Sequence, residues 1–161
     1  MSDKKSWVEK LNSAKPHEVT KAPMAIGGAK KGDKLLIPSP QIIADEIKAI
    51  PEGESRDIEQ LRVILAAKFG ADVACPIAMN IQLRMVAEAA YESLGAGVAI
   101  AEITPFWRVL DEKEPLTQKL SCGADFVRRR RAMEGVTQAA PKAIDEDEER
   151  RERFRSKSLW A

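Results

Sequence analysis

The feature that most constrains the fold is a series of apolar stripes with helical spacing between residues 39 and 94. Pro51 follows the first stripe, Gly70 the second and Gly95 the third. Apolar side chains that recur every three or four residues lie on one face of a helix, and that face has to be buried against another element. The sequence therefore predicts three consecutive helices, over residues 40–50, 55–69 and 76–94. Ser39 and Ser55 are the expected N-caps of the first two.

A different pattern follows the third predicted helix. Residues 98–101 and 103–110 are rich in β-branched and aromatic side chains, which favour strands, and Pro105 sits near the entry of the second one. The polar residues 111–114 and the return at 115–117 indicate a hairpin. A last helix is expected from Gly123 to Glu134.

The order of these elements predicts a fold class. Two helices joined by a short turn, then a hairpin and a closing helix, are the outline of a winged helix-turn-helix. The expected fold is mainly α with a small β wing, an α+β class. Helix 76–94 is the expected recognition helix.

Charge is distributed unevenly along the chain. Residues 1–35 carry eight Lys and Arg against four Asp and Glu, and residues 27–32 combine glycine with lysine. We expect a basic, flexible N-terminal arm over 1–35, a winged-helix domain over 36–138 and a charged, helical tail over 139–161. Because phosphate backbones bind basic surfaces, Lys30 and Lys31 are candidate nucleic-acid contacts.

The cysteine and histidine content argues against several classes of site. Cys75, Cys122 and His17 are too few and too scattered for a structural zinc site or a disulfide framework. We therefore expect no metal, no cofactor and a reducing, cytoplasmic setting. No apolar run approaches the ~18 residues of a membrane span, so no membrane partner is expected.

Three segments, in the same order, carry a resemblance to a known family. Pro105-Phe106-Trp107-Arg108-Val109 resembles the Pro-Cys-His-Arg-Val motif of the alkylguanine-DNA alkyltransferase family. Ile50-Pro51-Glu52-Gly53, followed by Gln60, resembles the turn before that family's first motif helix. Ser121-Cys122-Gly123, followed by four arginines at 128–131 and Glu134-Gly135, resembles its basic helix. The likeness spans roughly residues 36–136 and implies the family's DNA-binding domain.

The same resemblance implies that the family's reaction is lost. Its nucleophilic cysteine corresponds to Phe106 and its histidine to Trp107, and alkyl transfer requires a thiolate. The chain is similar in kind to the short alkyltransferase-like proteins, which lack that cysteine and bind alkylated DNA without repairing it. Arg108 also has a plain structural interpretation as one half of an ion pair.

Part of the remaining site follows from that alignment, and the rest from the polar and basic residues of the predicted recognition helix and arm. The family's nucleotide-rotating Tyr corresponds to Ile58 and its arginine finger to Ile77, which would serve as an apolar wedge. Its paired glycines correspond to Asn80 and Ile81. The candidate DNA contacts are Ile58, Ile77, Asn80, Arg84, Arg128, Arg129, Lys30 and Lys31. The candidate pocket residues are Phe106, Trp107, Arg108 and Ser121.

Two functions from different classes stay open. The first is a non-catalytic, repair-related protein that binds double-stranded DNA, including alkylated or otherwise modified DNA. The second is a degenerate winged-helix domain that binds a protein partner through its tails. Phe106 and Trp107 either line an aromatic pocket for an extruded base or fill that pocket as core.

Overall fold

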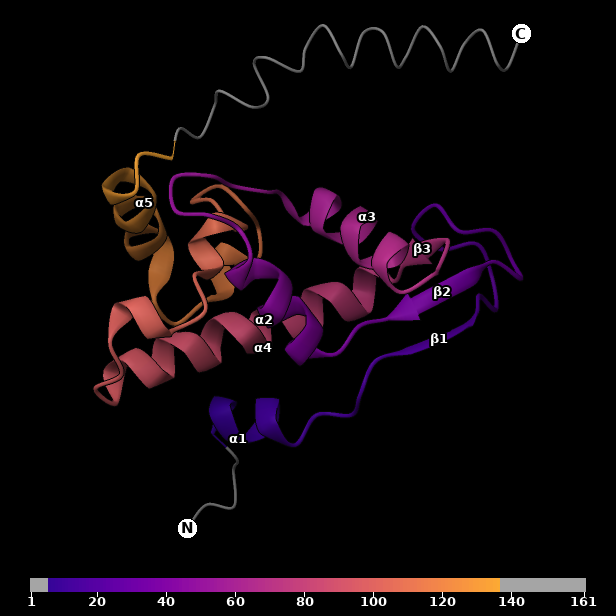
Figure 1. Cartoon of the computed structure of the whole chain (residues 1–161), viewed down its shortest axis with the longest axis horizontal. Coiled ribbons are helices and arrows are strands. Elements are labelled where there is room, and N and C mark those ends of the chain that lie inside the picture. Colours follow the sequence, from indigo (N-terminus) through magenta and orange to yellow (C-terminus); the bar gives the residue numbers. More distant parts are fainter. Residues whose placement is uncertain (1–5, 137–161) are drawn as a thin grey trace, which may run out of the picture.

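The computed structural model describes residues 6–136, and helices make up about half of them (Figure 1). The helices are α1 (Trp7–Asn12), α2 (Pro40–Lys48), α3 (Ile58–Lys68), α4 (Pro76–Gly95) and α5 (Gly123–Met133). The strands are β1 (Glu18–Lys21), β2 (Lys34–Ile37) and β3 (Val73–Ala74). The α+β class is therefore confirmed. The tail expected over 139–161 lies outside the described residues.

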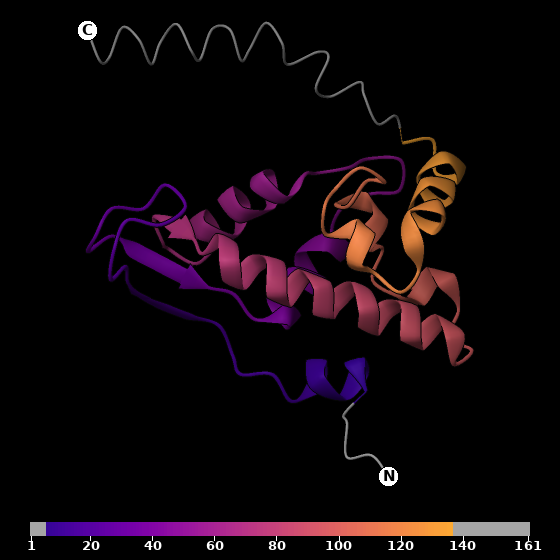
Figure 2. The same ribbon diagram turned by 180° about the vertical axis from the view of Figure 1, so that it is seen from behind.

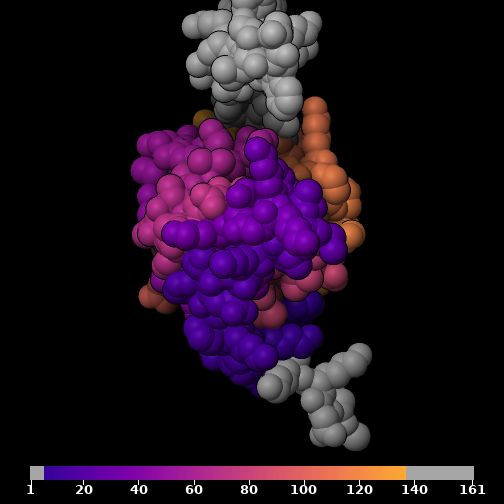
Figure 3. Space-filling view, turned by 90° about the vertical axis from the view of Figure 1, so that its right-hand side faces the viewer, coloured from indigo at the N-terminus to yellow at the C-terminus, as the bar shows by residue number. Residues whose placement is uncertain are grey.

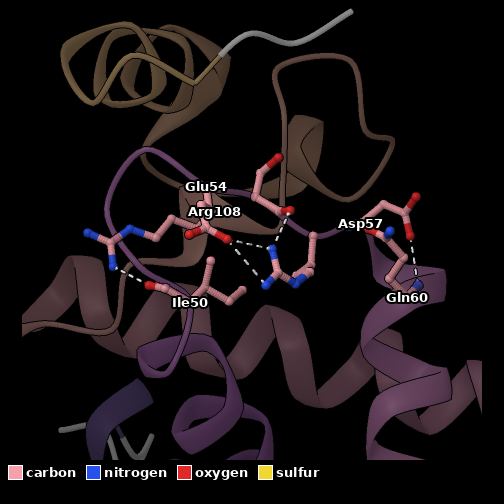
Figure 4. Close-up of polar contacts among 7 residues, drawn as sticks. Ile50, Glu54, Asp57, Gln60 and Arg108 are labelled. Atoms are coloured by element: carbon pink, nitrogen blue, oxygen red, sulfur yellow. Dashed lines mark hydrogen bonds and ion pairs between the residues drawn. The ribbon is translucent and has the colours of Figure 1, made fainter. Parts of the chain in front are cut away.

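The predicted helices are present, and their ends have local causes. Ser39 accepts a hydrogen bond from the amide of Ile42 at 3.3 Å and begins α2, as its sequence position indicates. The expected cap of α3 at Ser55 is wrong by two residues. Asp57 accepts from the Gln60 amide at 2.7 Å, and the Gln60 side chain accepts from the Asp57 amide at 2.9 Å (Figure 4). This reciprocal pair satisfies two amides that the first turn leaves without partners.

Helix α4 is the longest element, and the other helices are arranged around it. Figures 1 and 2 show it running from the sheet at one end of the molecule toward α5 at the other. α1 and α2 both pack on it. Its buried side chains, among them Met79, Leu83 and Val86, join the main core together with residues of α2, α3 and the segment 103–127.

The strands and hairpin expected over residues 98–117 are absent. This segment instead forms three short 3₁₀ helices, η1 (Ile100–Glu102), η2 (Phe106–Arg108) and η3 (Thr117–Lys119). Its amides find acceptors within the segment. The Phe106 amide donates to the Thr104 carbonyl at 2.8 Å, and the Arg108 amide donates to the Pro105 carbonyl at 2.9 Å. Pro105 offers no amide for a ladder, and burial alone explains the apolar composition.

The sheet comes from the N-terminal region instead. β1 pairs antiparallel with β2, and β2 pairs parallel with β3, so β2 is central. The boundary expected between residues 35 and 36 falls inside β2, and the expected separate arm is folded onto the domain. Its loop contributes Ala22 and Ala29 to a second small core with Leu35 and Cys75. Among the described helices, none is long and apolar enough to cross a bilayer.

Candidate nucleic-acid interface

Phe106 and Trp107 are core residues in this structure. Their side chains are 0 % and 1 % exposed, and their rings pack edge-on at 5.3 Å between centroids. Phe126 of α5 stacks on Phe106 at 5.9 Å and meets Trp107 edge-on at 6.1 Å. Of the two arrangements that the sequence left open, the structure has the filled one. A base has no access to these rings unless they leave the core.

Arg108 belongs to a buried polar network beside Trp107. Its guanidinium donates to the Glu134 carboxylate at 2.9 and 3.1 Å. It also donates to the Ile50 carbonyl at 2.7 Å, a bond that Figure 4 shows. The Trp107 indole N–H donates to the same carboxylate at 2.8 Å. Burial of Glu134 disfavours its charge, but the bonds from Arg108 and Trp107 outweigh that and lower its pKa. Arg108 is thus half of a structural ion pair.

The four consecutive arginines of α5 divide into two pairs. Arg131 is buried and donates to the Trp107 carbonyl at 2.7 Å, and the Arg130 guanidinium lies over the Trp107 ring at 5.0 Å. Arg128 and Arg129 are exposed, and Arg128 pairs with Asp125 at 3.0 Å. The second pair is the more accessible one, because Arg131 is buried and Arg130 lies against the Trp107 ring.

Ser121 and its neighbour Cys122 lie against a buried acid. The Glu88 carboxylate on α4 is 3 % exposed and accepts from the Ser121 amide and hydroxyl, both at 3.1 Å. Burial and then the Glu88 charge raise the pKa of the Cys122 thiol to about 11. At neutral pH this sulfur is therefore protonated and a poor nucleophile.

A cavity of about 450 Å³ opens beside the Trp107 segment. Its lining combines cations with carboxylates: Lys48, Glu52, Glu102, Arg108, Arg130 and Glu134 contribute, with Trp107 and apolar residues of the 100–105 segment. Arg108 and Glu134 already bond each other there. The mixed signs give this cavity no preference for an anionic ligand such as a phosphate.

The first half of α4 presents an uncovered face. Ile77 and Ile81 are 60 % and 59 % exposed, and Asn80 is exposed between them. Arg84, one turn further on, is half-buried, with its guanidinium 5.7 Å from the Trp7 ring of α1. Ile58, at the start of α3, packs against the main core. Of these candidates, Ile77 and Asn80 are therefore the accessible ones.

Lys30 and Lys31 lie on the loop between β1 and β2, and that loop adjoins α4. A Cβ placed on Gly27 would lie 2.6 Å from the Pro76 side chain, the first residue of α4. Both lysines are exposed, and the structure contains no ion pair for either of them in the part of the chain it describes. The loop thus brings two lysines without an ion pair to the end of α4 that exposes Ile77. It also carries the Asp33 carboxylate, which accepts from the Lys30 amide at 2.8 Å.

The candidate contacts therefore form two groups. Figures 1 and 2 place α5, with Arg128 and Arg129, at one end of the molecule and the β1–β2 hairpin at the other. We call the second group the hairpin end: Lys30 and Lys31 together with Ile77, Asn80 and Ile81. The fold therefore does not bring all the candidate DNA contacts onto one recognition surface.

Sequence reasoning missed Arg62 of α3, which turned out to join the loop to the domain. Its guanidinium donates to the Gly27 carbonyl and the Ala74 carbonyl, 35 and 12 residues away in sequence. No local pattern signals such distant main-chain partners. The role of Glu134 was missed for the same reason, although its position before Gly135 was noted.

Comparison with known proteins adds no assignment to this geometry. No protein-family model, no curated protein and no solved structure matches the chain. Among residues 6–136, no three His, Cys, Asp or Glu side chains are grouped so that they could hold a metal ion.

Proposed function

We propose that the protein is a non-catalytic, double-stranded DNA-binding protein that uses the hairpin end as its interface. The observation that carries this proposal is the uncovered first half of α4, where Ile77 and Ile81 are exposed. The loop that carries the exposed Lys30 and Lys31 meets the start of this helix, at Gly27 and Pro76. In this proposal α3 and α4 act as a helix-turn-helix of the alkyltransferase-like kind. Helix α4 is then the recognition helix.

The chemistry of the exposed residues fits the proposed role. The first residues of a recognition helix contact base edges in the major groove. Asn80 carries an amide that pairs with adenine edges, and Ile77 and Ile81 offer apolar contacts of the kind that thymine methyl groups accept. Lys30 and Lys31 bind the flanking phosphates, which supply most of the salt-dependent affinity.

In this role the protein carries out no chemical reaction on DNA. The position that resembles the family's nucleophile is Phe106, and the Cys122 thiol is protonated at neutral pH because its pKa is raised to about 11. The protein also extrudes no base in this role, because Phe106 and Trp107 fill the core. We therefore expect an alkylated and an unmodified duplex to bind equally well.

A second candidate function is a protein-interaction module. Val63 on α3 is 64 % exposed and lines a cavity of about 290 Å³ with Ala66, Ala67 and Ala71. Glu59, Arg62 and Asp72 also line this cavity. Its apolar part suits an aliphatic side chain of a protein partner, and its two carboxylates disfavour a phosphate backbone. The sequence placed the contacts of such a module on the tails, and residues 137–161 lie outside the described part of the chain.

The test is a fluorescence-anisotropy titration with a short duplex, with and without one alkylated guanine. Asn80→Asp places a negative charge on the proposed groove-facing surface, and Asn12→Asp makes the same change on α1. We expect Asn80→Asp to weaken binding at least tenfold and Asn12→Asp to leave it unchanged. Equal weakening by both variants, or no binding by the wild type at low salt, contradicts the proposal and favours the interaction module. Tighter binding to the alkylated duplex contradicts the filled-pocket part alone.

A further inference from the structure

We infer that the loop joining β1 and β2, with its flanking lysines, is a pre-formed phosphate-binding element, and that Arg62 is its positioning residue. We call residues 21–34 the basic loop. This inference rests on the proposed DNA-binding function and deepens it. It assigns the role expected of a wing to an N-terminal hairpin, whereas the sequence placed the wing over residues 98–117.

The basic loop has a fixed internal structure. The Ala22 amide donates to the Asp33 carbonyl at 2.8 Å, and the Gly32 amide donates back to the Ala22 carbonyl at 2.9 Å. Inside this frame, Ile26 and Ala29 exchange two backbone bonds of 3.0 and 2.8 Å. These bonds define one conformation of the loop, which lowers the entropy that a ligand would otherwise have to remove.

Arg62 fastens the loop to the rest of the domain. Its guanidinium donates to the Gly27 carbonyl at 2.9 Å and to the Ala74 carbonyl at 2.9 and 3.1 Å. The Arg62 side chain thus binds both a loop carbonyl and the carbonyl of Ala74, the residue before the α4 N-cap. The planar guanidinium with its five donors can bridge two carbonyls in fixed geometry, which a lysine ammonium cannot reproduce.

Gly27 confirms how closely the loop approaches. Its φ is +55°, a left-handed backbone conformation that residues other than glycine rarely adopt. A Cβ at this position would lie 2.8 Å from the Arg62 guanidinium. Pro76 would be closer still, at 2.6 Å. The loop, α3 and the start of α4 therefore meet at one point.

This attachment leaves the cations outside. Ala22 and Ala29 are 2 % and 3 % exposed and form the inner side of the loop. The lysines of the loop are all exposed, and they are Lys21, Lys30, Lys31 and Lys34. Figure 3 looks onto this end of the molecule, where the N-terminal segment forms the front surface beside α3. A duplex seated on the first half of α4 would have these lysines beside its backbone.

The experiment measures the slope of log Kobs against log salt for an unmodified duplex. Each neutralised phosphate contributes about 0.9 to that slope, so Lys30→Gln/Lys31→Gln should reduce it by about 2. Arg128→Gln/Arg129→Gln removes the same charge from the opposite end and should leave the slope unchanged. Arg62→Lys keeps the charge and removes the bridge, so its slope should fall toward that of the lysine double variant.

A combined variant separates positioning from general damage. If Arg62 acts through the two lysines, Arg62→Lys should weaken binding in the wild type but have little further effect in the Lys30→Gln/Lys31→Gln background. Urea unfolding establishes that each variant is folded under the conditions of the titration. Gly27→Ala disturbs the same junction from the loop side and should act as Arg62→Lys does.

The outcomes distinguish this inference from the proposed function. A wild type that does not bind DNA overturns both. Binding that is sensitive to Asn80→Asp but whose slope is unchanged by the lysine double variant overturns the role of the basic loop alone. An Arg62→Lys effect of equal size with and without the lysines overturns the positioning role of Arg62.

Discussion

The two ends of the molecule use basic side chains in opposite ways. At the α5 end, Arg108 and Arg131 point inward, where they donate to the Ile50 and Trp107 carbonyls. At the hairpin end, Lys30 and Lys31 point to solvent while a single arginine, Arg62, fixes the backbone that carries them. A run of arginines at the α5 end thus leaves only some of its cations at the surface, whereas both lysines of the hairpin end are exposed.

A run of arginines in a sequence does not by itself mark a ligand-binding surface. A guanidinium has five donors in a plane and is more weakly hydrated than an ammonium, so it can be buried where carbonyls and carboxylates surround it. Arg131 is 7 % exposed and Arg108 pairs with the nearly buried Glu134. Lysine lacks this geometry and stays at the surface. Exposure, more than the count of positive residues, therefore indicates which cations a ligand can reach.

The largest expected effect concerns Trp107 at the α5 end. Trp107→Ala should reduce the free energy of unfolding by about 3–5 kcal/mol, because it removes the largest buried side chain and leaves a cavity. Urea denaturation measures the loss. Trp7→Ala on the half-buried helix α1 is the control and should cost much less. A Trp107→Ala protein of wild-type stability would mean that this ring is not part of the core. The α5 end would then again be a candidate ligand-binding site.

Glu134→Gln should have the next largest effect. The substitution preserves shape but removes the charge that Arg108 and Trp107 both contact, and hydrogen bonds to charged groups contribute about 1.5–3 kcal/mol each. Denaturation midpoints measure the change. Glu52→Gln, an exposed acid on the same cavity, is the matched control. Equal effects of the two variants would contradict a specific role for the Glu134 network.

The pH dependence of stability should follow from the same carboxylate. The pKa of Glu134 in the folded protein is lowered from its ordinary value of 4.5, so the charged form favours folding. This contribution is fully present above pH 4.5 and is lost as pH falls through the lowered pKa. Unfolding measured at several pH values should therefore show an acid-side loss that is smaller in Glu134→Gln. Identical profiles for wild type and variant would contradict this assignment.

Sequence reasoning succeeded where the signal was local. The helices α2, α3 and α4 follow from apolar spacing and from the stops at Pro51, Gly70 and Gly95. It failed over residues 103–110, where apolar and β-branched composition predicted a strand. Composition reports that a segment is buried, and both a strand and a 3₁₀ turn such as η2 satisfy that condition.

The candidate site was harder to predict from the sequence than the fold was. Lys30, Lys31, Ile77 and Asn80 were identified individually, but their grouping depends on the loop meeting the start of α4. That meeting is made by Arg62 and Gly27 through main-chain contacts that leave no pattern in the sequence. The exposed Arg128 and Arg129 were grouped with them only because both sets are basic.

The smallest expected effect concerns α1, which covers the second half of α4. The Glu92 carboxylate accepts the amides of Trp7 and Val8, both at 3.1 Å, and these backbone bonds help to lower its pKa. Glu92→Gln should loosen α1 and shift the Trp7 fluorescence, with Trp7→Phe identifying that signal. Global stability should change little, because α1 has no buried residue.

The same variant sharpens the contrast between the two ends. Loosening α1 uncovers Arg84, whose guanidinium lies near the Trp7 ring, and so lengthens the open face of α4. If the interface is confined to the hairpin end, Glu92→Gln should change DNA affinity far less than Lys30→Gln/Lys31→Gln does. Clearly tighter binding by Glu92→Gln would mean instead that the interface continues along α4 and that α1 normally limits it. Anisotropy titrations of the two variants at one salt concentration decide between these outcomes.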